Sequence, residues 1–242
     1  MCTGHLLGAE ALVRWPARGR EFTPEITFNT LEQSNIICTV TRWVCQKVVE
    51  DYSQSLWACD QFYITVNLST IDVLDRTFPD FVKALTTRYA IPASHLAFEI
   101  TERVALGGKL ARTQLSRLRA MGHLILLDDF GTGYSNLTYL EQLPVDVIKI
   151  DKMFTHRTGF SATIILSHII KLVQCLDIDV IVEGVETSAQ AERMKRLGAH
   201  KAQGWLYSKE LPAHELVRAY FSSPDQGLYT ALRGGLQGLP PE

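Results

Sequence analysis

The chain has 242 residues, of which 46% are hydrophobic and 21% charged, and its formal net charge is −2. This composition is typical of a globular protein with one large core or two small ones, and it argues against a binder of nucleic-acid polymers, which would carry a basic surface. No apolar run approaches the ~20 residues of a membrane-spanning helix, and no signal peptide is visible, so we expect no membrane contact by this segment.

Cysteine usage favours a reducing compartment. The five cysteines are odd in number, and no two have the CxxC spacing of a zinc or redox site; they are Cys2, Cys38, Cys45, Cys59 and Cys175. We interpret them as reduced thiols and expect a cytoplasmic domain, which a longer parent protein could anchor to the inner membrane.

Short apolar runs alternate with longer amphipathic segments. In chain order, the strand-like runs are residues 6–15, 62–68, 95–100, 123–127, 146–150, 179–182 and 199–206. Segments with helical spacing lie between and after them: residues 29–52, 78–90, 105–121, 160–176, 188–197 and 213–221. Gly122 and Gly198 are expected to end two helices, and Thr187 or Ser188 to begin one.

This alternation predicts an α/β fold built from parallel βαβ units. The length suits a TIM-like (β/α) barrel, whose usual size is about 250 residues. A doubly wound open sheet is the competing architecture, but no GxGxxG motif follows the first strand-like run. We expect one domain over residues 1–222 and a disordered tail, rich in Gly and Pro, over residues 223–242.

Carboxylate and amide side chains, together with one lysine, lie in or directly after almost every strand-like run. Glu10, Asn67, Glu99, Glu102, Asp128, Asp129, Lys149, Asp151, Glu183, Glu186 and Gln203 all occupy such positions. In a barrel of parallel strands these positions share one face, and so many acids in one place require compensating cations. Two divalent cations with oxygen ligands are the simplest answer, and the adjacent Asp128 and Asp129 suit a shared position between them.

Each of these residues also has an ordinary structural explanation. Asp128 and Asp129 could cap the next helix, Glu186 could belong to a first helical turn, and Lys149 could pair with any nearby acid. Such explanations weaken jointly, because six strand ends show the same pattern.

Other chemistry is less well supported. No HxxxH pair or GxSxG elbow occurs, which argues against a His-based zinc site and acyl transfer. His95 and His123 begin strand-like runs and are interpreted as structural. Trp205 and Tyr207 follow the last run and could stack on a base or belong to the core.

The chain resembles the EAL family of cyclic di-GMP phosphodiesterases. The resemblance rests on seven blocks in family order, from Gly8 to about Leu216: GAEALVRW, VNLS, FEITE, LLDDFGTGYSNL, IKID, VEGVET and AQGWLYSK. It implies a TIM-like barrel and hydrolysis of cyclic di-GMP to linear pGpG with two divalent cations, Mg²⁺ or Mn²⁺.

The resemblance also implies a role for each site residue. Glu10, Asn67, Glu99 and Asp128 would hold one metal, and Asp128, Asp129 and Glu183 the second. Lys149 and Glu183 would position and activate water, supported by Glu186 and Gln203. Leu12, Arg14 and Asp151 would contact the substrate. Residues 129–136 resemble a loop that couples metal binding to dimerisation, with Glu102 as its anchor.

One departure from the family lies at the start. Family members usually carry an additional strand ahead of the EAL motif, antiparallel to its neighbour, and here only five residues precede Leu6. We expect the barrel to lack this strand, and the chain to be less stable than one with its native upstream residues restored.

Two other functions remain open from the sequence: a catalytically silent cyclic di-GMP receptor, and a protein-interaction module. The resemblance further implies a homodimer and an upstream sensory domain in a longer parent protein.

Overall fold

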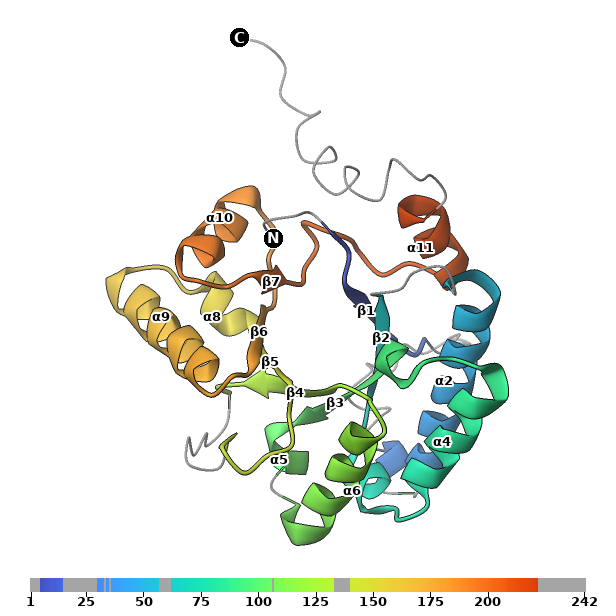
Figure 1. Ribbon diagram of the computed structural model, residues 1–242. Helices are drawn as coiled ribbons and strands as arrows, with labels where there is room; N and C mark the ends of the chain where they lie inside the picture. The colour runs from blue at the N-terminus through green and yellow to red at the C-terminus, as the bar shows by residue number, and fades with distance from the viewer. Residues whose placement is uncertain are drawn as a thin grey trace. The chain divides into compact units, whose positions relative to one another are not determined.

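The computed structural model describes residues 5–14, 30–32, 34, 36–56, 62–105, 107–132 and 140–221 (Figure 1). These residues form two compact units, one over Gly8–Ile125 and the other from Leu126 onward together with residues 5–7. Seven described strands follow one another in the sheet in chain order, from β1 to β7. The predicted tail, residues 223–242, lies outside the described residues.

The N-terminal unit contains three parallel strands: β1 (Gly8–Glu10), β2 (Tyr63–Asn67) and β3 (Leu96–Thr101). The register places Glu10 beside Thr65, and Asn67 beside Glu99. Consecutive residues of β2 and β3 are buried, because helices and neighbouring elements cover both faces of a parallel sheet.

Helices α2, α4 and α6 lie together on one side of β2 and β3 (Figure 1). The helical elements of this unit are α2 (Ile37–Asp51), the π-helix η1 (Tyr52–Leu56), α3 (Thr70–Leu74), α4 (Phe78–Tyr89), the 3₁₀-helix η2 (Ala93–His95), α5 (Glu102–Ala105) and α6 (Gly108–Ala120). The helix predicted over residues 105–121 is therefore wrong in its start: two helices lie there, because Gly108 adopts a φ of +78°.

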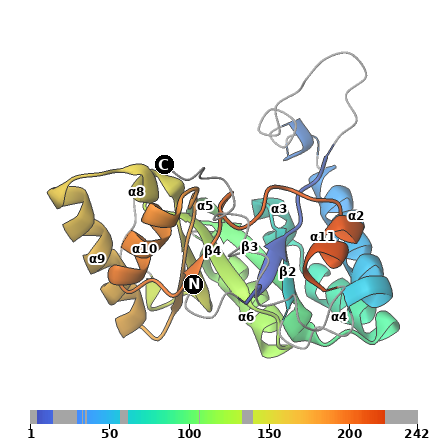
Figure 2. The same ribbon diagram turned by 90° about the horizontal axis from the view of Figure 1, so that it is seen from above.

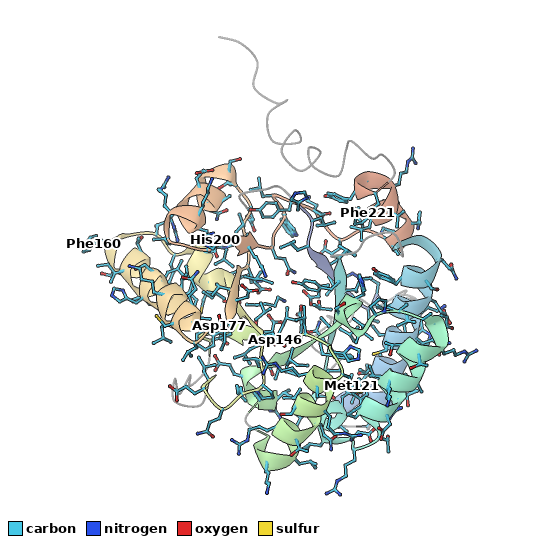
Figure 3. All side chains as sticks on the ribbon, in the orientation of Figure 1. Met121, Asp146, Phe160, Asp177, His200 and Phe221 are labelled. Atoms are coloured by element: carbon cyan, nitrogen blue, oxygen red, sulfur yellow. The ribbon has the colours of Figure 1, made fainter. Side chains whose placement is uncertain are left out.

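The C-terminal unit takes up most of β4 (Ile125–Phe130) and contains β5 (Val147–Ile150), β6 (Asp179–Val182) and β7 (Lys201–Ala202), all paired in parallel. Its helices are α8 (Lys152–His156), α9 (Phe160–Cys175), α10 (Ser188–Arg196) and α11 (Ala213–Tyr220). Figures 1 and 2 show α8, α9 and α10 grouped together. In Figure 3, Asp146, Asp177 and His200 mark the residues that lead into β5, β6 and β7.

Several local predictions are confirmed. Gly122 and Gly198 follow helices α6 and α10 with φ values of +99° and +96°. Thr187 begins α10 with a capping box, in which its hydroxyl accepts from Gln190 N–H. The first strand is shorter than predicted: among the described residues 6–14 it covers Gly8–Glu10, and the Ala11 N–H donates one more hydrogen bond to the carbonyl oxygen of Thr65 in β2.

The two histidines predicted to be structural are buried. His95 Nδ1 lies 2.7 Å from the carbonyl oxygen of Phe62, and His123 Nδ1 lies 2.8 Å from that of Leu96. Burial lowers the pKa of His123, with backbone hydrogen bonds acting in the opposite direction. Among the described helices, none combines the length and the apolar character that crossing a bilayer demands.

Candidate active site

Three carboxylates gather at the carboxyl ends of two strands in the C-terminal unit. Asp128 and Asp129 lie in the last half of β4, and Glu183 follows β6 directly. One carboxylate oxygen from each of the three lies within 4.8 Å of the others. We call these three residues the acidic cluster.

An irregularity in β4 explains how two adjacent residues reach the same cluster. Successive side chains of a regular strand point to opposite faces. Here the pairing with β5 shifts between Leu127 and Phe130, and Asp129 adopts a φ of +54°. The shift and the left-handed residue turn the chain locally, so that both Asp128 and Asp129 bring a carboxylate oxygen to Glu183. Asp is among the few residues that tolerate this backbone conformation.

Lys149 of β5 is the cation beside the acidic cluster. Its side chain is only 1% exposed, and Nζ lies 2.8 Å from Glu183 Oε1 and 3.1 Å from Asp128 Oδ1. A buried ammonium group requires such partners, since desolvation strongly disfavours an isolated charge. With all four groups ionised, three carboxylates and one lysine leave an excess of two negative charges.

The acidic cluster fits a divalent cation. Asp128 Oδ1 is buried and, despite lying 3.1 Å from Lys149 Nζ, accepts no hydrogen bond of good geometry from the described residues. A buried carboxylate oxygen with open lone pairs, in a group with excess negative charge, suits a hard cation with oxygen ligands such as Mg²⁺ or Mn²⁺.

Glu183, Glu186 and Gln203 belong to one hydrogen-bonded pair of turns. The Gln203 N–H donates to the carbonyl oxygen of Val182, and the Val185 N–H donates to the carbonyl oxygen of Gln203. Glu186 lies two residues before the start of α10, and its backbone N–H donates to Gln190 Oε1 at 2.8 Å. Its carboxylate is 46% exposed and Oε1 lies 3.8 Å from His156 Nε2. The backbone of Gln203 is thus hydrogen-bonded to Val182 and Val185, which lie on either side of Glu183, and Glu186 follows Glu183 by three residues.

The N-terminal unit holds a second group of predicted ligands. Asn67 Nδ2 donates to Glu10 Oε1 at 2.8 Å, and Asn67 is the register partner of Glu99. Glu99 is a buried carboxylate, only 2% exposed. Glu10, Asn67 and Glu99 therefore lie at the carboxyl ends of β1, β2 and β3, as predicted.

The remaining predicted residues have simpler surroundings. Leu12 is 44% exposed, and Arg14 is exposed and donates to the carbonyl of Val13 at 3.2 Å. Glu102 is the first residue of α5. Asp151 Oδ1 accepts from Met153 N–H at 2.8 Å, so it caps α8. Residues 133–139, which include most of the predicted loop, lie outside the described residues.

Sequence reasoning missed His156, whose imidazole lies against the turn between Glu183 and Glu186. It belongs to no spaced motif, and only the packing of α8 reveals it. Among the described residues, Cys38, Cys45 and Cys175 form no disulfide.

The parallel strands and the acidic cluster define an α/β protein with a candidate divalent-cation site. A family model described as the EAL domain matches residues 1–210, and the chain belongs to this family. Its fold is accordingly the family's TIM-like barrel with a curled parallel sheet, which confirms the predicted fold class.

Individual relatives agree with the family. PdeB of Escherichia coli, a probable cyclic di-GMP phosphodiesterase, is 36% identical over 219 residues, covering 90% of this chain and 42% of PdeB. The phosphodiesterase part of MucR of Pseudomonas aeruginosa, solved in complex with c-di-GMP, is 34% identical, with a TM-score of 0.81 over 88% of this chain and 89% of that structure. The cGMP-bound EAL enzyme Bd1971 has a TM-score of 0.83 and 28% identity, over 88% of this chain and 60% of that structure. The chain thus spans less than half the length of PdeB.

Proposed function

We propose that the chain hydrolyses cyclic di-GMP to linear pGpG with the help of two divalent cations, Mg²⁺ or Mn²⁺. The observation that carries this proposal is the acidic cluster of Asp128, Asp129 and Glu183 around the buried Lys149. The names of the relatives PdeB and MucR support cyclic di-GMP as the substrate.

The proposed cation ligands follow the family resemblance. Asp128, Asp129 and Glu183 would hold one cation, and their proximity within the C-terminal unit supports this assignment. Glu10, Asn67, Glu99 and Asp128 would hold the other. The support for the first three is their common position at strand ends of the N-terminal unit. If Asn67 ligates through its oxygen, its amide nitrogen still points to Glu10, as the observed hydrogen bond requires.

The cations would stabilise the negative charge that develops on the phosphate oxygens, and they would favour ionisation of water. Lys149 would donate a hydrogen bond from Nζ to the attacking water, and Glu183 would accept the proton of this water. The water oxygen bonds to phosphorus, the P–O3′ bond breaks, and O3′ takes a proton from solvent. The position of Lys149 Nζ, 2.8 Å from Glu183 Oε1, suits this joint role.

Leu12, Arg14 and Asp151 are the proposed substrate contacts. The exposure of Leu12 and Arg14 is compatible with this role. Asp151 already uses Oδ1 as a helix cap, so any contact with substrate would involve its second oxygen. Glu186 and Gln203 would order water around Glu183, and Glu102 would anchor the loop after Asp129.

A direct assay tests the proposal. The purified protein is incubated with cyclic di-GMP with Mg²⁺, with Mn²⁺ and with EDTA, and pGpG is quantified by chromatography. We expect metal-dependent pGpG formation by the wild type and none by Asp128→Asn or Glu10→Ala. Tight binding without cleavage in any metal would instead identify a receptor, and no binding at all would identify an interaction module.

The proposal also covers the oligomeric state of the domain, its parent protein and its location in the cell. We infer a homodimer, an upstream sensory domain in a longer parent protein and a cytoplasmic location. The greater length of PdeB supports the second inference, and the free cysteines support the third. Light scattering during size-exclusion chromatography tests the dimer.

A further inference from the structure

The short helix α8 is fixed at both ends within the C-terminal unit. At its start, Asp151 accepts from Met153 N–H at 2.8 Å. At its end, Nη2 of Arg193, which comes from α10, donates to three carbonyl oxygens: those of Phe154 and Thr155 at 3.2 Å and that of Arg157 at 2.9 Å. A five-residue helix has little stability of its own, so these contacts determine where it lies.

Two glycines of the acid-bearing segments rest directly on α8. A Cβ atom on Gly131, two residues after Asp129, would lie 2.5 Å from Phe154 Cε2. A Cβ atom on Gly184, directly after Glu183, would lie 2.4 Å from Lys152 Cβ. At Gly184 the backbone therefore approaches that of α8 more closely than a residue with a Cβ atom permits, whereas at Gly131 the Phe154 ring occupies the space of a Cβ atom.

His156 adds a polar contact to the second of these turns. Its Nε2 lies 2.9 Å from the carbonyl oxygen of Gly184, and a carbonyl oxygen can only accept, so Nε2 carries the hydrogen. The same nitrogen lies 3.8 Å from Glu186 Oε1. One imidazole thus holds the peptide after Glu183 and lies beside the carboxylate of Glu186.

Exposure separates this contact from ordinary core packing. The side chain of His156 is 43% exposed, so its removal costs little buried apolar area. Its main interaction is the hydrogen bond to the turn that carries Glu183.

We propose that His156 is a positioning residue of the acidic cluster: through its hydrogen bond to the Gly184 carbonyl it fixes the orientation of Glu183. The role in turnover rests on the proposed function, whereas the role in cation binding requires only the acidic cluster. His156 would act through Glu183 and is not itself a proposed cation ligand.

The test compares His156→Ala, His156→Gln and the matched control His168→Ala. His168 is also exposed and also contacts a carbonyl oxygen, that of Ile164 at 2.8 Å within its own helix α9. For each protein we would measure Mn²⁺ affinity by calorimetry, kcat and KM for cyclic di-GMP, and the thermal midpoint without metal.

We expect His156→Ala to weaken Mn²⁺ binding and to lower kcat, each by about tenfold or more, with a smaller change in KM. The Gln side chain offers an N–H donor, so His156→Gln should recover most of both losses. His168→Ala should match the wild type, and all four midpoints should be similar.

Mn²⁺ affinity of His156→Ala equal to that of His168→Ala would overturn the proposal. Equal losses in the Ala and Gln variants, together with lowered midpoints, would do the same by showing a packing role. If the wild type binds Mn²⁺ but cleaves nothing, the proposed function fails, and His156 is then judged on Mn²⁺ affinity alone.

Discussion

The buried ammonium group of Lys149 contributes both to the stability of the fold and to the charge balance of the acidic cluster. Its ammonium group is buried between Asp128 and Glu183, whereas Lys201 forms a surface pair with Asp179 at 2.6 Å. We expect Lys149→Met to lower the free energy of unfolding in EDTA by about 3–5 kcal/mol, because carboxylates are left without their cation. The control Lys201→Met should cost less than about 1 kcal/mol.

Urea denaturation of both variants, with and without Mn²⁺, measures these costs. Saturating Mn²⁺ should narrow the deficit of Lys149→Met, since the bound cation compensates the same carboxylates, while turnover stays abolished. A deficit that is unchanged by Mn²⁺ would argue against a cation at the acidic cluster.

Asp129 combines a proposed ligand role with a strained backbone. At its φ of +54°, a residue with a Cβ atom is disfavoured relative to glycine. We expect Asp129→Gly and Asp129→Ala to lose Mn²⁺ affinity equally, because both lack the carboxylate. The Gly variant should be more stable by about 1 kcal/mol. Equal stability of the two variants in urea would show that the left-handed conformation is not kept in solution.

The buried His123 predicts a pH dependence of stability. Its folded pKa is lowered from 6.5, chiefly by burial, so the unfolded chain binds protons more readily. The contribution of His123 is therefore fully present above pH 6.5 and is lost as pH falls toward the folded pKa, by up to about 1.4 kcal/mol per pH unit. Urea midpoints at pH 7.5 and 5.5 should differ less for His123→Gln than for the wild type. The exposed His168→Gln variant should keep the wild-type slope.

Single residues of the candidate site differ in how far the sequence reveals them. Strand-end acids such as Glu10 and Glu183 are visible because a strand and its last residue can both be read from the sequence. The joint use of Asp128 and Asp129 depends on a register shift in β4, which alternation alone would contradict. His156 becomes visible only once α8 packs against Gly184.

At the scale of elements, the contact between α8 and the turn after β6 makes a specific demand on Gly184. Its φ is +66°, and an added Cβ atom would meet Lys152 Cβ at 2.4 Å. Gly108 offers a matched control, because its φ is +78° and an added Cβ atom would meet nothing within 4 Å. Both alanine variants bear backbone strain of about 1–2 kcal/mol, but only Gly184→Ala must also displace α8 or the turn.

We therefore expect Gly184→Ala to lose more thermal stability than Gly108→Ala and also to lose Mn²⁺ affinity, which Gly108→Ala should retain. Thermal denaturation and calorimetry check the two effects. Similar losses in both variants would show that the turn after β6 is not supported by α8.

Element prediction succeeds where periodicity is long. The strands β2, β3, β5 and β6 and the helices α4, α9, α10 and α11 lie close to their predicted ranges, whereas β1 and β7 are shorter than predicted and α2 and α6 begin later. The helices α3 and α8 were not predicted, because five residues are too few to show a period of 3.6. Their positions depend instead on caps and on contacts such as that of Arg193 with α8, which are remote in sequence.

For the molecule as a whole, strand order could be predicted from the pattern of strands and helices, but the choice between a barrel and an open sheet could not. Alternating strands and helices fit an open doubly wound sheet as well as a barrel. Seven motif blocks in family order decided between them, and the likeness to solved EAL structures confirms this choice. Composition and periodicity alone would have left both architectures open.

Cation binding should be visible in the stability of the entire chain. A ligand that binds only the folded state adds about 2.7 kcal/mol to the free energy of unfolding when its concentration is 100 times its Kd. For a chain of this size, this corresponds to a rise of roughly 5–10 °C in the thermal midpoint.

We expect Mn²⁺ to raise the thermal midpoint of the wild type and of the control Lys201→Met by this amount. Asp128→Asn should gain almost nothing, because it removes the charge of one of the three carboxylates in the acidic cluster. Glu99→Gln tests the ligands proposed in the N-terminal unit and should gain an intermediate amount. A full Mn²⁺ shift in Asp128→Asn would place the cation elsewhere and would remove the physical basis of the proposed hydrolysis.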